Sequence, residues 1–142
     1  MLKQSLLAIA LILPMSVHAA TTKKPDASSP FTKTRNQAAG NLSTNIVTLQ
    51  KMANLCSNEK NAEKIKTSVS EWQTRNKPFL KMHYGYVTAL IESAQEKATE
   101  EELKKFKDNL VKVNNENANT IIKTLVDKDG KDLACEKYFT YL

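Results

Sequence analysis

Apolar side chains recur every three or four residues along most of the chain beyond residue 30, the spacing of one face of an α-helix. A first helix is expected over about residues 32–56. A second begins near Ser57 or Asn58, either of which can cap it. The apolar positions of these two helices are Leu42, Ile46, Leu49, Ala53 and Cys56, then Ala62, Ile65, Val69 and Trp72.

Pro78 leaves two interpretations of the middle of the chain. Proline lacks a backbone N–H and disfavours a helical conformation in the residue before it. Either a helix ends near Asn76 and a new one opens at Pro78, or one long helix is kinked there. The helical spacing resumes beyond this point at Leu80, His83, Val87, Leu90, Ile91 and Ala94.

The last long helix has clear start and stop signals. Thr99 and Glu102 have the spacing of a capping box, and Gly130 suits the left-handed conformation that often ends a helix. The apolar face of this helix is interrupted at Asn117 or Ala118. There a buried Asn is expected to fix the register between helices, or the Asn-rich stretch lines a polar groove. A short terminal helix from about Asp132 follows and carries Cys135, Phe139 and Leu142.

Residues 1–19 have the pattern of a secretory signal peptide. Lys3 precedes an apolar run from Ser5 to Leu13, and small side chains at Val17 and Ala19 precede the expected cleavage site. The run is shorter than the roughly 20 apolar residues that a membrane-spanning helix needs, and no other segment is apolar enough. We therefore expect a periplasmic or secreted protein, with a flexible lead over residues 20–30 and a single helical domain over residues 31–142.

Cys56 and Cys135 are the only two cysteines, and both lie in the part expected to be exported. In an oxidising compartment they most simply form one disulfide. Bonded cysteines need Cα atoms within about 7 Å of each other, and a full chain reversal at Pro78 would leave these two at opposite ends of a bundle. The sequence therefore predicts an all-α antiparallel bundle of three long helices, the middle one kinked at Pro78, plus a short C-terminal helix. A four-helix up-down bundle is the alternative.

The chain carries no recognisable catalytic, cofactor or metal-binding motif. Once the signal peptide is removed, His83 is the single histidine. One histidine without a nearby carboxylate cluster makes a poor catalytic triad and a poor metal site. It is expected at the boundary of the core. The adjacent carboxylates Glu100, Glu101 and Glu102 are interpreted as first-turn residues that favour the positive end of the helix dipole. We predict that the protein is not an enzyme and binds no cofactor.

Four residues form the candidate binding surface: Trp72, Arg75, His83 and Tyr86. A structural role is favoured for the first two, with Trp72 filling the core and Arg75 reaching a carboxylate or carbonyl near the kink. A ligand pocket between helices, if one forms, is expected near Trp72, His83 and Tyr86. The formal net charge is +6, which allows weak contact with anionic polymers or lipid head groups. The basic residues alternate with acidic ones, so a nucleic-acid-binding surface is not expected.

These features favour a non-enzymatic, exported helical-bundle protein that acts by protein–protein contacts in the bacterial envelope. Its role would be that of a binding, chaperone-like or inhibitory module, and its partner an unidentified envelope or extracellular protein. The alternative is a periplasmic carrier or sensor of a small ligand held between the helices.

Overall fold

The structure, a computed structural model, describes residues 30–142, and the expected signal peptide and most of the expected flexible lead lie outside that range. The described residues form helices and no strand, which confirms the predicted all-α fold. The helices are α1 (Lys33–Cys56), α2 (Ala62–Arg75), α3 (Lys77–Gln95), α4 (Glu100–Asp129) and α5 (Lys131–Thr140).

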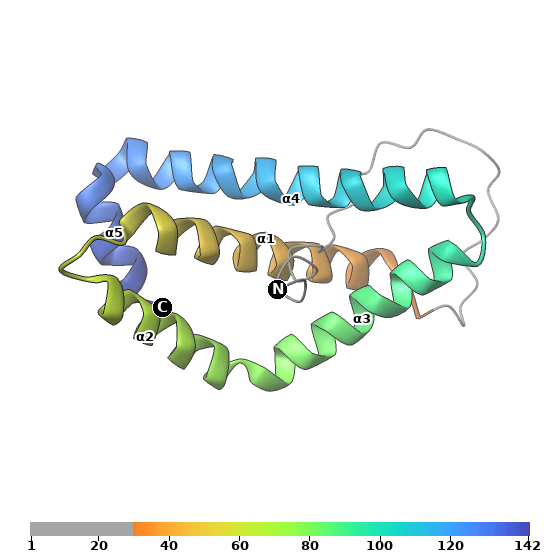
Figure 1. Ribbon diagram of the computed structural model, residues 1–142, viewed down its shortest axis with the longest axis horizontal. Helices are drawn as coiled ribbons and strands as arrows, with labels where there is room; N and C mark the ends of the chain where they lie inside the picture. The colour runs from red at the N-terminus through yellow and green to blue at the C-terminus, as the bar shows by residue number, and fades with distance from the viewer. Residues whose placement is uncertain (1–29) are drawn as a thin grey trace.

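The long helices α1 and α4 lie side by side and run in the same direction, while α2 and α3 together return in the opposite direction (Figure 1). The short helix α5 folds back from the end of α4 and lies next to α1 and α2. α1 is the central helix, because all four of the other helices contact it. Its buried side chains accordingly lie on more than one face of the helix.

The middle helix is bent and does not reverse, as predicted. Only Asn76 separates α2 from α3. Helical hydrogen bonds continue on both sides of it, from the Asn76 N–H to the Trp72 carbonyl (3.0 Å) and from the Leu80 N–H to the Asn76 carbonyl (2.9 Å). Pro78 occupies the first turn of α3, where its missing N–H costs least. The chain therefore changes direction at Asn76 and bows outward, and the four-helix alternative does not form.

The two ends of α4 follow the predicted signals. At its start the Glu102 N–H donates to the Thr99 hydroxyl (3.3 Å), and the Thr99 N–H donates to the Glu102 carboxylate (2.8 Å). At its end Gly130 adopts a positive φ of 75°, which glycine reaches without the steric cost that a side chain would add. Gly130 also precedes α5 directly, so the sharp turn between the two helices depends on this residue.

A layer of buried polar side chains divides the core into two apolar parts. The layer consists of Ser43, Thr44, Thr48, His83 and Asn114, and within the described range no fully buried side-chain nitrogen or oxygen lacks a hydrogen-bond partner. One apolar part is built on Ala39, Val87 and Leu110, and the other on Met52, Cys56 and Ile65. Burial of polar groups is tolerated here because each is paired.

Asn114 is the buried residue that links the two parallel helices. Its amide donates to the Leu110 carbonyl (2.8 Å), and its side-chain oxygen accepts a hydrogen bond from the Thr44 hydroxyl of α1 (3.2 Å). The sequence placed the polar interruption at Asn117 or Ala118, but Asn117 is only half-buried and Ala118 is a small core residue. A buried asparagine does lie between the helices, one turn earlier than expected.

The predicted disulfide joins Cys56, the last residue of α1, to Cys135 in α5, with a Cα–Cα distance of 5.6 Å. α5 buries only Ala134. Tyr138 and Phe139 are half-buried against the apolar core built on Met52. The bond therefore adds a covalent constraint to a helix that packs only shallowly on the core.

We expect Asn114→Ala to lower the free energy of unfolding by about 2 kcal/mol or more. The substitution leaves a cavity and removes the acceptor of the buried Thr44 hydroxyl. Asn115→Ala is the matched control, because Asn115 makes the same side-chain bond to the carbonyl four residues earlier and has no partner on α1. It should cost less than about 1 kcal/mol. Equal losses in urea unfolding would show that the link to Thr44 contributes nothing.

Candidate functional site

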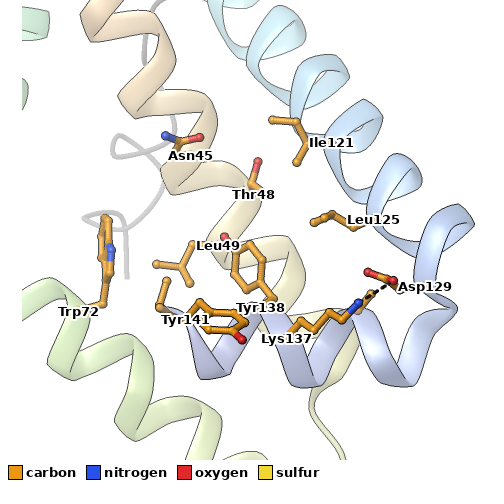
Figure 2. A pocket seen from close by; sticks show the side chains of 12 residues that line it. Asn45, Thr48, Leu49, Trp72, Ile121, Leu125, Asp129, Lys137, Tyr138 and Tyr141 are labelled. Carbon is orange, nitrogen blue, oxygen red and sulfur yellow. Dashed lines mark hydrogen bonds and ion pairs between the residues drawn. The ribbon is translucent and has the colours of Figure 1, made fainter.

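A groove of about 440 Å³ lies between α1, α2, α4 and α5, and we call it the Trp72 groove (Figure 2). It exists because the bend at Asn76 carries α2 outward, so that Trp72 faces this space and is only half-buried. The lining residues are Asn45, Thr48, Leu49, Trp72, Ile121, Leu125, Asp129, Ala134, Lys137, Tyr138, Tyr141 and Leu142.

Three aromatic side chains dominate the groove. Trp72 comes from α2, while Tyr138 and Tyr141 come from α5 and the residues just after it. Tyr138 is half-buried against Phe139, with ring centroids 5.3 Å apart, and burial raises the pKa of Tyr138 to about 12. Its phenol therefore stays neutral at ordinary pH. Tyr141 is 86% exposed, so a large aromatic surface at the edge of the groove faces solvent.

The charged groups of the groove neutralise each other. The Lys137 ammonium lies 2.7 Å from the Asp129 carboxylate. The Thr48 hydroxyl donates to the Thr44 carbonyl within α1, and the Asn45 amide is exposed. An occupant therefore meets an apolar and aromatic surface with a few neutral hydrogen-bonding groups. This lining suits an uncharged, largely apolar group.

Arg75, the second candidate binding residue, lies at the end of α2 and contacts the segment after α5. Its guanidinium donates a hydrogen bond of 2.9 Å to the main-chain oxygen of Leu142, which lines the groove. Arg75 thereby holds the segment after α5 against α2. The candidates Trp72 and Arg75 are thus brought to the same region.

His83 and Tyr86, the other two candidates, lie on α3 outside the Trp72 groove and fasten that helix to α1 and to Phe31 just before it. The Tyr86 hydroxyl donates to the Asn36 side-chain oxygen, and its ring contacts that of Phe31 edge to face at 5.6 Å. His83 is 5% exposed, more buried than the boundary position expected from the sequence. Neither His83 nor Tyr86 lines the Trp72 groove.

The contact between His83 and Ser43 has the polarity of a structural hydrogen bond. The Ser43 hydroxyl lies 2.8 Å from the Ala39 carbonyl, which can only accept, so the hydroxyl proton is donated there. The His83 Nε2 is 2.9 Å from the same hydroxyl oxygen and must therefore carry the proton that it donates to Ser43. A histidine acting as a base would instead accept the serine proton. In this pair the histidine is the donor and the serine oxygen is the acceptor, so the pair is not arranged for base catalysis.

The predicted binding surface did not include Tyr138 of α5 or Tyr141, which follows α5. One signal was available, because Leu49 lies two helical turns before Cys56 and Tyr138 lies one turn after Cys135. A disulfide between these cysteines brings the two stretches together. The exposure of Tyr141 depends on the exact course of the chain after α5, which periodicity does not give.

Neither metal-binding geometry nor a known relative assigns a role to the groove. Among residues 30–142, no group of three or more His, Cys, Asp or Glu side chains is arranged to hold a metal ion. Comparisons with models of protein families, with curated proteins and with solved structures found no match to this chain. The groove is therefore interpreted from its own side chains.

We expect the free energy of unfolding to decrease as the pH falls below about 6.5 and His83 becomes protonated. Burial lowers the pKa of His83 in the folded state. As the pH falls, His83 is therefore protonated in the unfolded chain before it is protonated in the folded protein. The stabilisation from neutral His83 is complete above the pKa of the unfolded state and is lost as the pH falls through the pKa of the folded state. Urea unfolding from about pH 7.5 to about pH 5 measures this loss while most carboxylates remain ionised.

His83→Gln is the control for this pH dependence. Its side-chain amide can still donate to Ser43, but it does not titrate. The decrease between these pH values should be smaller in the variant. An identical pH dependence in the two proteins would assign the effect to other groups.

Proposed function

We propose that this protein is an exported, non-enzymatic binding protein that acts by contact with another protein of the bacterial envelope, through the Trp72 groove. One observation carries the proposal. The groove is aromatic, its Lys137 and Asp129 charges pair with each other, and Tyr141 at its edge is 86% exposed. Large exposed apolar surfaces next to a depression mark interaction sites on proteins.

The form of the groove favours a protein partner over a carried small molecule. Trp and Tyr are the residues most enriched among the anchors of protein interfaces. The groove is partly open to solvent, whereas small-molecule sites usually bury about 70–90% of their ligand. An apolar side chain of a partner would enter beside Trp72, and the partner's surrounding surface would cover Tyr141.

Export is supported by the N-terminal pattern and by the disulfide. The pattern in residues 1–19 is that of a cleaved signal peptide, and disulfides persist in oxidising compartments. Within residues 30–142 no helix is both long and apolar enough to cross a membrane. Mass spectrometry of protein from the envelope fraction should find a chain that begins at Ala20. A cytoplasmic protein that retains residues 1–19 would contradict export.

The non-enzymatic part of the proposal rests on the state of the one mature histidine. His83 is buried and donates its Nε2 proton to Ser43, so it is oriented to hold α3 against α1. The Trp72 groove, in turn, contains no histidine or cysteine side chain that could act as a nucleophile or base at neutral pH.

A small-ligand carrier is the second candidate, and the groove volume of about 440 Å³ favours it, because ligand sites commonly measure about 300–1,000 Å³. Trp72 is the only tryptophan of the chain, so its fluorescence reports on this groove alone. Saturable energy transfer from Trp72 to the neutral probe N-phenyl-1-naphthylamine, without a protein partner, would support the carrier.

Site-specific photo-crosslinking in the native host tests the protein-binding proposal. The photoreactive residue p-benzoylphenylalanine is placed at Tyr141, at the groove edge, and separately at Leu133. Leu133 is the matched control because it is an exposed apolar residue of α5 that does not line the groove. We expect the Tyr141 position to give a discrete crosslinked protein and the Leu133 position to give none.

The same crosslink should be lost, or reduced about tenfold or more, when Trp72 is replaced by Ala, since a central aromatic anchor carries about 2 kcal/mol or more of binding energy. Far-UV circular dichroism checks that the variant is folded. Equal crosslinking from positions 141 and 133, or a crosslink that persists in Trp72→Ala, would contradict recognition through the groove.

A further inference from the structure

The outer face of the bend between α2 and α3 exposes two large apolar side chains. Phe79 is 60% exposed and Met82 is 64% exposed. They lie three residues apart in α3 and therefore share one face of the helix. An adjacent face of the same turns buries Leu80 and His83 in the core. Packing within the bundle thus explains only one side of this segment.

The same bend is basic. Lys77 and Lys81, each two residues from Phe79 in the sequence, are exposed on another part of the helix surface. None of the ion pairs within residues 30–142 involves them. The stretch from Trp72 to Ile91 contains no Asp or Glu. Elsewhere in the described helices, lysines form exposed pairs with acidic residues one turn away, as Lys105 does with Glu101. The bend is therefore a local positive surface in a chain whose charges are otherwise mixed.

The bend also projects from the molecule. In Figure 1 the junction of α2 and α3 is the part of the bundle farthest from α4. Neither Phe79 nor Met82 lines the Trp72 groove. A projecting vertex offers no depression for the side chains of a protein partner, and stable protein interfaces bury about 800 Å² on each side. A layer of lipid head groups, in contrast, deforms around a projecting aromatic residue.

We propose that this bend, formed by Lys77, Pro78, Phe79, Lys81 and Met82, docks on the surface of an anionic phospholipid membrane. Phe79 and Met82 enter the boundary between head groups and acyl chains, and the two lysines contact lipid phosphates. The docking is peripheral and reversible. It does not depend on the Trp72 groove, so it stands or falls independently of the proposed protein partner.

Vesicle co-sedimentation of the mature, oxidised protein tests the proposal. The vesicles contain either phosphatidylcholine alone or equal parts of phosphatidylcholine and phosphatidylglycerol. Binding to the anionic vesicles should be at least about tenfold tighter than to the neutral ones, and it should weaken in about 0.5 M salt, where the Debye length is only a few ångströms.

Two double variants separate the charged from the apolar contribution. Lys77→Gln/Lys81→Gln and Phe79→Gln/Met82→Gln should each weaken binding to anionic vesicles by about tenfold or more. The matched controls are Lys60→Gln/Lys64→Gln, which removes two exposed lysines with the same spacing, and Leu133→Gln, which removes another exposed apolar side chain. All of these positions are exposed, and thermal unfolding followed by circular dichroism checks each fold.

The controls and Trp72→Ala should bind anionic vesicles as the unchanged protein does. Equal binding to neutral and anionic vesicles, or equal weakening by Lys60→Gln/Lys64→Gln, would overturn the proposal. Self-association in the absence of vesicles that disappears in Phe79→Gln/Met82→Gln would instead identify a second copy as the occupant. Capture of an acidic protein by the bend without any vesicle binding would also overturn the lipid assignment.

Discussion

The bond between Cys56 and Cys135 is the constraint on which the rest of the functional surface depends. α5 has 10 residues and buries only Ala134, and isolated helices of that length are marginal in water. Half-buried Tyr138 and Phe139 also pack against the core. The Lys137–Asp129 ion pair and the bond from Arg75 to the main-chain oxygen of Leu142 lie nearer the surface and add little. Closing a loop of 79 residues lowers the entropy of the unfolded chain by an amount worth up to about 4–5 kcal/mol. We therefore expect the covalent bond to be the largest single contribution that holds the aromatic wall of α5 in place.

The bend at Asn76 is the second organising feature, because it shapes the surface on both its inner and its outer side. On the inner side it moves α2 away from α1 and leaves Trp72 facing a groove. On the outer side it presents Phe79 and Met82 to solvent. A straight helix would pack more of its length against α1 and would offer neither surface. The buried polar layer around His83 and Asn114 fixes how α3 and α4 sit on α1, so the bend has a defined position.

The fold was largely predictable from the sequence, whereas the site was predictable only in part. Helical periodicity, the capping box at Thr99 and the single pair of cysteines are local or countable signals, and they led to the bent three-helix arrangement with its short terminal helix. Which residues of a helix become buried depends on the neighbouring helices. For that reason the sequence placed His83 at the core boundary and the polar interruption at Asn117 or Ala118. It also did not distinguish the exposed Phe79 from the buried Leu80. Trp72 was identified, but its neighbours on α5 become visible only when the disulfide is followed in space.

Hydrogen exchange followed by mass spectrometry most directly tests whether the disulfide holds α5 and completes the groove. The oxidised protein is compared with Cys56→Ser/Cys135→Ser under conditions in which α1 and α4 remain folded. We expect amides in residues 131–140 to lose protection in the variant by a much larger factor than amides in the middle of α1 and α4. Protection of α5 that falls no more than that of α1 and α4 would show that α5 is held by its non-covalent contacts, and would contradict the dependence of the groove on the disulfide.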